Sequence, residues 1–100
     1  MAIGQGNRQT LAADGPTTAK QFIGPVRLVL SGTFGGGTAV LRTVDPSNTP
    51  IPEVNGSFTA ITSTRFDFPD ESINVIDVDL SGATPTFELV VWIQGNQIGQ

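Results

Sequence analysis

Residues 26–44 read VRLVLSGTFGGGTAVLRTV, and this stretch decides how the chain is expected to fold. Val26, Leu28 and Leu30 alternate with polar or mixed residues, the period-two pattern of a strand with one buried face. Glycines 35–37 supply the positive φ of a tight turn, and a second β-branched run follows them. Phosphate binding by these glycines is not expected, because it needs a helix N-terminus beside them. The stretch predicts a hairpin, and its weaker copy VDLSGATPTFELVVWI at residues 78–93 predicts a second one.

Shorter alternating stretches fill much of the remaining chain. Residues 57–68, 73–80 and 86–93 alternate with a period of two, and the last has two usable apolar faces. Asn55-Gly56 predicts a further hairpin turn, whereas Pro50 and Pro52 exclude a central strand around them. The pattern predicts an all-β fold, a single β-sandwich or barrel of about six to seven antiparallel strands.

The N-terminal segment lacks this alternation. Residues 1–21 are small and polar, so we expect an extended N-terminal arm there and a β-sandwich domain at residues 22–100. Two interpretations of the arm stay open. It is either a disordered terminus or a segment that becomes ordered on a neighbouring molecule.

Composition limits the chemistry of the chain. Its 100 residues include neither cysteine nor histidine, and its formal net charge is −4. Disulfides, thiolate metal sites and histidine-based catalysis are therefore excluded. The acidic balance argues against a nucleic-acid partner, and no apolar run approaches the ~18–20 residues of a membrane-spanning helix. The first residues contain no secretory signal, so synthesis in the cytoplasm is expected.

The sign of charge changes along the chain. Through Val44, four basic residues accompany Asp14 alone, and from Asp45 onward eight acids accompany Arg65. One interpretation is that the split only marks solvated faces. The other is head-to-tail complementarity between neighbouring subunits.

Acidic clusters are the remaining candidates for chemistry. Asp77 and Asp79 share one face of a strand, and we interpret them as solvated aspartates rather than a glycosidase pair. Asp67, Asp70 and Glu71 cluster in one turn, and Asp45 and Asn48 in another, but neither cluster has the regular spacing of a calcium loop. We expect no enzyme activity, no metal and no cofactor.

Trp92, the only tryptophan, lies on the strand face opposite Leu89 and Val91. It belongs either to a second core layer or to a subunit or ligand contact, where tryptophan is enriched. A sugar-stacking role is weaker, because no second ring is in phase with it. Residues 45–52 form the longest interruption of the β pattern after the arm, so we expect contacts from this loop.

Several of these stretches resemble small structural proteins of tailed bacteriophages. The matching motifs are LVLSGTFGGGTAVL at residues 28–41, a Val-Asp-Pro-Ser turn at 44–47, FDFP at 66–69 and VDLSGAT at 78–84. The chain departs from the family pattern at the second turn, where Asp-Pro-Ser-Asn replaces the usual Pro-Asp-Gly order. The resemblance covers residues 26–93.

The resemblance implies a capsid decoration (cement) protein on the surface of a virion, made in the host cytoplasm. Its partners would be the major capsid protein and copies of itself, as a homotrimer, without nucleic acid or membrane. A tail-associated receptor- or carbohydrate-binding module is the alternative. The expected contact residues are Ile3, Arg8, Leu11 and Phe22 toward the coat, and Pro50, Ile51, Pro52 and Trp92 toward another copy.

Overall fold

The computed structural model describes residues 6–84 and 86–98, and within them the chain forms eight strands and no helix. The all-β prediction is confirmed. The strands are β1 Gly6–Leu11, β2 Gly15–Pro16, β3 Lys20–Gly32, β4 Thr38–Val44, β5 Pro50–Phe58, β6 Thr62–Phe66, β7 Ile73–Ser81 and β8 Leu89–Ile98. No helix in this described part of the chain is long and apolar enough to cross a membrane.

All pairings are antiparallel and join the strands into one sheet with the order β1-β8-β3-β7-β4-β5. β2 adds to β7, and β6 adds to β3. The prediction of a six- to seven-stranded sandwich or barrel is therefore wrong in strand number and in closure. The fold is one open, eight-stranded sheet.

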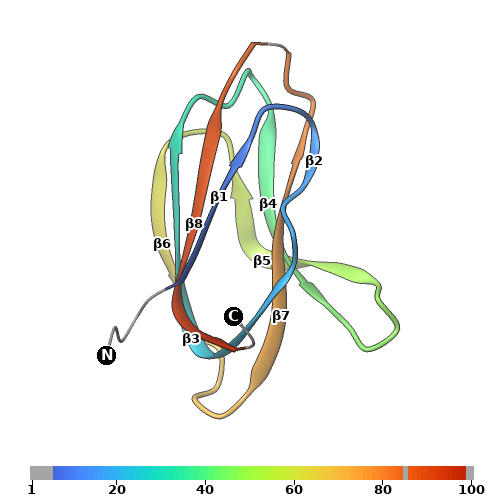
Figure 1. The fold of residues 1–100 in the computed structure, drawn as a ribbon, viewed down its shortest axis with the longest axis vertical. Helices are drawn as coiled ribbons and strands as arrows, with labels where there is room; N and C mark the ends of the chain where they lie inside the picture. The colour runs from blue at the N-terminus through green and yellow to red at the C-terminus, as the bar shows by residue number, and fades with distance from the viewer. Residues whose placement is uncertain (1–5, 85, 99–100) are drawn as a thin grey trace.

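The long strand β3 bends this sheet over itself. Residues 20–23 pair with β7, whereas residues 26–32 pair with β6 and β8. The register shifts between Ile23 and Arg27, where Gly24 has a φ of 75° that favours glycine. Two layers result, seen side by side in Figure 1. One contains β6, the second part of β3, β8 and β1, and we call it the front layer; the other contains β2, β7, β4 and β5, and we call it the back layer.

The core fills the space between the two layers. The alternating residues of β3, β4, β7 and β8 point inward, as the period-two pattern predicts. The buried set is Phe22, Val26, Leu28, Leu30, Phe34, Ala39, Leu41, Phe66, Ile76, Val78, Leu80, Leu89, Val91 and Ile93. Burial of this apolar surface is the main source of stability in a domain without disulfides.

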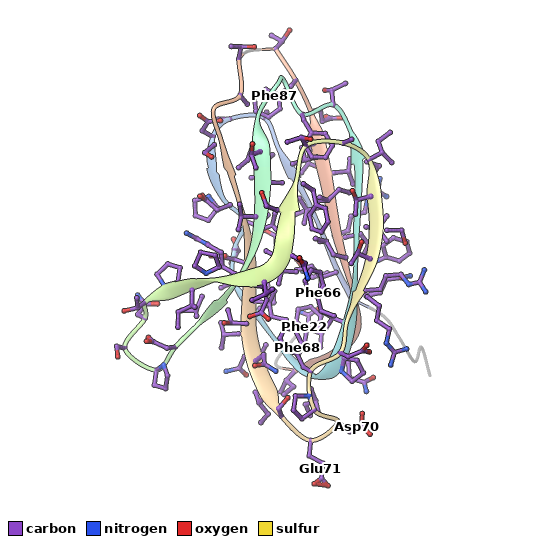
Figure 2. All side chains as sticks on the ribbon, turned by 180° about the vertical axis from the view of Figure 1, so that it is seen from behind. Phe22, Phe66, Phe68, Asp70, Glu71 and Phe87 are labelled. Carbon is purple, nitrogen blue, oxygen red and sulfur yellow. The ribbon has the colours of Figure 1, made fainter. Side chains whose placement is uncertain are left out.

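Aromatic rings pack between β5 and β6, two strands that are not paired with each other. Phe58 and Phe66 meet edge to face with ring centroids 6.5 Å apart, and Phe66 and Phe68 stack at 6.4 Å. Figure 2 shows Phe66 and Phe68 near Phe22, while Asp70 and Glu71 point into solvent at the end of the molecule. Side chains thus cover the core at this edge.

The two Ser-Gly motifs form arches rather than hairpins. β3 does not pair with β4, nor β7 with β8, since each connection carries the chain from one layer to the other. The prediction of two hairpins is wrong, because turn residues indicate a change of direction and not the partner of the following strand. Figure 1 shows both arches side by side at one end.

Hydrogen bonds join the two arches, and each arch begins at a glycine of the repeated motif. The amide of Thr33 donates to the Glu88 carbonyl at 2.8 Å, and the amide of Thr84 donates to the Gly35 carbonyl at 2.8 Å. Gly32 and Gly82, the glycines of the two motifs, both have positive φ, 86° and 74°. The repeated motif therefore marks the point where each strand leaves its layer.

The N-terminal segment belongs to the sheet. β1 pairs along its whole length with β8, and β2 pairs with β7. The Gln9 side chain extends this order, because its Oε1 accepts the Thr18 amide at 2.8 Å and its Nε2 donates to the Thr18 carbonyl at 2.9 Å. The extended arm predicted over residues 1–21 is therefore wrong for residues 6–21. Its polar composition suits an edge strand, which needs few apolar residues to be held by backbone pairing.

Candidate functional site

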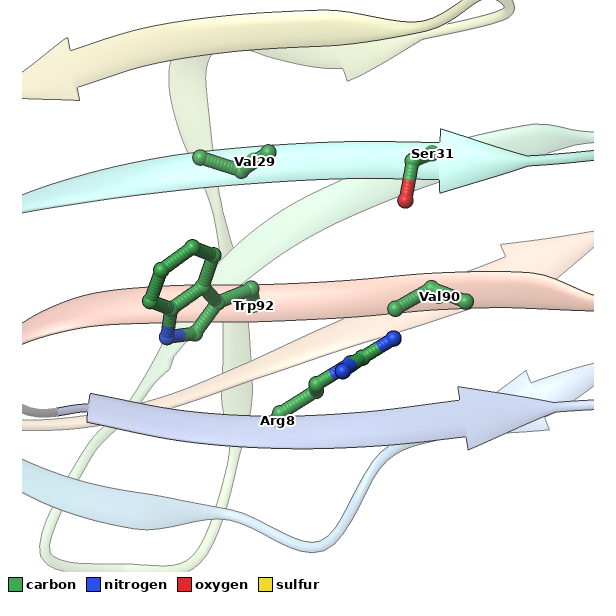
Figure 3. Close-up of a pocket in the computed structure, with 5 residues that line it drawn as sticks. All are labelled: Arg8, Val29, Ser31, Val90 and Trp92. Atoms are coloured by element: carbon green, nitrogen blue, oxygen red, sulfur yellow. The ribbon is translucent and has the colours of Figure 1, made fainter.

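The first candidate surface lies on the outside of the front layer. Arg8 of β1 stands opposite Trp92 of β8, and Trp92 stands opposite Val29 of β3. These three residues, with Ser31 and Val90, line a shallow groove of about 290 Å³. Figure 3 shows the five side chains on the same side of the three strands, with Arg8 extended toward Val90. We call this surface the Trp92 face.

Trp92 is held outward by the alternation of β8. Leu89, Val91 and Ile93 are buried, so Val90 and Trp92 must point away from the core. Trp92 is 39% exposed. Of the two interpretations of Trp92, a contact residue agrees with this exposure better than a member of a second core layer.

The charges on the strands of the front layer are all positive. β1 contributes Arg8, β3 contributes Arg27 and β6 contributes Arg65, while β8 has no charged residue. Arg27 donates to the Ser63 hydroxyl at 3.3 Å, and Arg65 pairs with Asp67 just beyond β6. The Trp92 face therefore combines an apolar centre with exposed guanidinium groups.

The second candidate surface is the β4–β5 hairpin, which projects away from the two layers (Figure 1). We call residues 43–54 the projecting hairpin. Its turn is closed by a 2.8 Å bond from the Asn48 amide to the Asp45 carbonyl and a 3.0 Å bond from the Asp45 amide to the Thr49 carbonyl. Asn48 has a φ of 65°, so this is a type I turn followed by a left-handed residue.

The Asp45 carboxylate stabilises this turn further. Its Oδ1 accepts the amides of Ser47 and Thr49, both at 2.9 Å. Pro46 occupies the turn position where its fixed φ is already suitable. The hairpin is therefore pre-organised. The segment 45–52, which was predicted as a loop because it interrupts the β pattern, contains this hydrogen-bonded turn.

A bulge directs the hairpin outward. Val40 pairs with Ser57 but Arg42 pairs with Pro52, so residues 53–56 bulge out of the ladder. Asn55, with a φ of 60°, lies within β5 and not in a hairpin turn, so the turn predicted at Asn55-Gly56 is wrong. Such bulges bend a strand strongly. Pro50 and Pro52 lie in an edge strand, which agrees with the prediction that they exclude a central one.

The projecting hairpin exposes apolar side chains. Ile51 is 47% exposed and Val54 is 81% exposed, and Pro46, Pro50 and Pro52 are exposed beside them. At its base, a groove of about 330 Å³ is lined by Thr43, Val44, Asp45, Pro46, Ile73, Asn74 and Val75. We call this the Ile73 groove, after a side chain that is 61% exposed.

The structure separates the predicted contact residues into groups. Arg8 and Trp92 meet on the Trp92 face, and Pro50, Ile51 and Pro52 lie on the projecting hairpin. Phe22 is fully buried, so its assignment to a coat contact is wrong. Leu11 is partly buried and packs against the core, and Ile3 lies outside the described residues. Val29 and Val90 were missed, although the alternation that buries Leu28 and Leu89 places both on the outer face.

The paired aspartates have a structural partner. Arg42 binds Asp77 through two bonds of 2.8 Å, and its Nη1 lies 3.9 Å from an Asp79 carboxylate oxygen. Only 5% of Asp77 is exposed, so its interpretation as a solvated aspartate is wrong. The hydrogen bond to Asp77 raises the pKa of Arg42 although burial opposes it. The sequence could not reveal this pair, because Arg42 and Asp77 come together only through the register in which β4 pairs with β7.

Metal ligands do not gather in the described residues. Within residues 6–84 and 86–98, no three Asp or Glu side chains are placed to hold one ion. The acids of the β6–β7 turn point into solvent, and Asp45 is occupied by backbone amides.

Comparison with known proteins adds no relative. A scan against protein-family models finds no match, and a search of curated proteins finds no similar sequence. The candidate binding surfaces of this chain are the Trp92 face, the projecting hairpin and the Ile73 groove.

Proposed function

We propose that this protein is a non-enzymatic structural component of a tailed-bacteriophage particle, a decoration (cement) protein bound to the capsid surface as a homotrimer. The observation that carries the proposal is the exposure of apolar side chains at three separate places. Trp92 lies on the front layer, Ile73 lies beside the groove, and Ile51 lies on the projecting hairpin. Each of the three lies beside further exposed or half-buried apolar residues, and apolar patches of this kind mark contact sites, whereas a single exposed apolar residue does not. A subunit with several such sites suits a lattice, where each copy has several neighbours.

The mechanism is stabilisation by mass action. A protein that binds the assembled lattice and not its separated subunits shifts the equilibrium toward the lattice by its binding free energy. The Ile73 groove with the nearby Ile23 is the surface we assign to the major capsid protein, since Ile23 and Ile73 stand opposite each other in the sheet. This replaces the N-terminal arm as the coat-binding element, because the described part of that arm is paired in the sheet.

The test measures copy number and binding together. Quantitative mass spectrometry of purified particles should find several hundred copies, the order of magnitude set by a closed lattice. Particles that lack the protein should bind the purified wild type, whereas Ile73→Asp should bind at least about tenfold more weakly, the loss expected for a contact residue. Ile61→Asp is the matched control, since Ile61 is 71% exposed in the β5–β6 connection. Absence from particles would refute the proposal.

A tail-associated carbohydrate-binding module is the second candidate, and the Trp92 face favours it. An exposed indole beside Arg8 and Ser31 offers a stacking surface together with hydrogen-bonding groups. A glycan array distinguishes the candidates. Binding of a specific sugar, together with only a few copies per particle, would support the tail module. No binding to any glycan, together with hundreds of copies per particle, would support decoration.

A further inference from the structure

We propose that the Trp92 face of one copy of this chain binds the projecting hairpin of a second copy, so that subunits join head to tail. This inference rests on the part of the proposed function that makes the protein a homo-oligomer. It goes further in assigning both sides of the contact and its direction. Its test uses purified protein alone, so its failure is distinguishable from failure of capsid binding.

The two surfaces match in polarity. The Trp92 face has an apolar centre of Trp92, Val29 and Val90 in a shallow groove. The hairpin presents Ile51 and Val54 with three exposed prolines. Because its turn is already closed by hydrogen bonds, the hairpin loses little conformational freedom on binding.

The two surfaces also match in charge. The strands of the front layer carry Arg8, Arg27 and Arg65, of which Arg65 is paired with Asp67 just beyond β6, so Arg8 and Arg27 supply the net positive charge. Residues 43–54 carry two acids, Asp45 and Glu53, and no base. Complementary potentials orient partners and discriminate against wrong pairings, since two faces of like charge repel. A face-to-face or hairpin-to-hairpin dimer would bring like charges together, so the charges favour the head-to-tail arrangement.

The fold prevents the contact from forming within one chain. The Trp92 face is the outer surface of the front layer, while the hairpin extends from β4 and β5 of the back layer and projects sideways (Figure 1). The hairpin must therefore reach a neighbouring molecule. A contact between two different patches is heterologous, and it builds a closed ring when the rotation between subunits closes. A trimer is one such ring.

Tryptophan fluorescence measures this contact directly. Trp92 is the only tryptophan and the chain has no tyrosine, so emission reports the Trp92 face alone. On concentration to about 0.1 mM, where even weak contacts form, the wild type should shift its emission to the blue. Sedimentation should show association over the same range. Ile51→Asp should weaken association at least about 30-fold, the effect of a central interface residue, and Ile61→Asp should leave it unchanged. A wild type that stays monomeric, or an Ile51→Asp variant that associates equally, would overturn the proposal.

Mixing two variants that cannot associate on their own tests the direction of the contact. Ile51→Asp keeps an intact Trp92 face, and Trp92→Glu keeps an intact hairpin. Each alone should be monomeric, and their mixture should form one-to-one dimers whose single tryptophan shifts to the blue. If Trp92→Glu does not fold, Arg8→Glu on the edge strand β1 replaces it, with sedimentation as the readout. A mixture that remains monomeric would overturn the head-to-tail arrangement. Binding of an acidic sugar at Trp92, in a protein that does not associate at any concentration tested, would also overturn it.

Discussion

Replacing Arg42 by leucine removes the cation that holds the buried Asp77 carboxylate. The guanidinium makes two bonds of 2.8 Å to that carboxylate, and Asp77 is 5% exposed. Leucine retains the aliphatic packing of the arginine stem but leaves the carboxylate without a partner. The expected result is a large loss of stability with the sheet topology retained.

The magnitude follows from the geometry. Breaking a buried pair by removing one partner costs about 3–5 kcal/mol, since an uncompensated charge remains. Arg42 keeps 18% of its side chain exposed and Asp79 is a second carboxylate at 3.9 Å, so water and the pairing network moderate the effect. We therefore expect about 3 kcal/mol. In a 100-residue domain this lowers the midpoint of thermal unfolding by roughly 12–24 °C.

Circular dichroism during heating and urea titration measures the loss. Arg65→Leu is the matched control, because Arg65 and Asp67 form a pair whose side chains are 63% and 75% exposed. Exposed pairs contribute about 0–1 kcal/mol. The double variant Arg42→Leu with Asp77→Leu should recover most of the stability, since no buried charge remains. An Arg42→Leu variant that loses no more free energy of unfolding than Arg65→Leu would show that the buried Asp77 carboxylate does not depend on Arg42.

The pH dependence of this pair has a definite sign. The pKa of Arg42 is raised in the folded protein, chiefly by its hydrogen bond to Asp77. A base with a raised pKa contributes stability that is complete below its unfolded pKa and is lost as the pH rises through its folded pKa. The difference in stability between wild type and Arg42→Leu should therefore stay constant from pH 7 to about pH 10, and a steady decline over that range would contradict the assignment.

Three further outcomes are expected. Gln9→Ala removes both bonds to Thr18 and should cost about 1–2 kcal/mol in urea unfolding; an unchanged midpoint would show that these bonds add nothing. Gly36→Ala should cost about 1–2 kcal/mol, because its φ of 77° is strained for alanine although the space is open. Gly32→Ala has the same type of strain and also places Cβ 2.3 Å from the Glu88 carbonyl oxygen, so it should cost clearly more than Gly36→Ala. If both glycine variants lose the same free energy of unfolding, the contact between a Cβ at position 32 and the Glu88 carbonyl oxygen is excluded as a cause.

Local patterns were sufficient for the all-β class and for most of the core. The alternation around Leu28, Leu80 and Leu89 correctly identified the inward faces, because a strand shows every second side chain to the same side. The edge position of Pro50 and Pro52 also followed from local chemistry, since proline lacks the amide that a central strand must donate. These properties belong to single residues and their immediate neighbours.

Predictions about strand partners failed where the answer depended on distant residues. The Gly-rich turn at residues 35–37 suits a hairpin as well as an arch, and only the pairing of β3 with β8 and β4 with β7 separates the two. The N-terminal segment has little apolar character of its own. It becomes β1 because the edge of β8 offers unpaired backbone groups to it.

The sequence by itself determined the all-β class, the inward faces of β3, β7 and β8, and the position of Trp92 on the strand face opposite Leu89 and Val91. Tertiary structure alone decided that Arg8 stands beside Trp92, that Arg42 neutralises Asp77, and that a bulge at residues 53–56 turns the proline-rich hairpin outward. The physical reason is that alternation acts over two residues, whereas register joins residues tens of positions apart. A surface built from three strands exists only after those strands have paired.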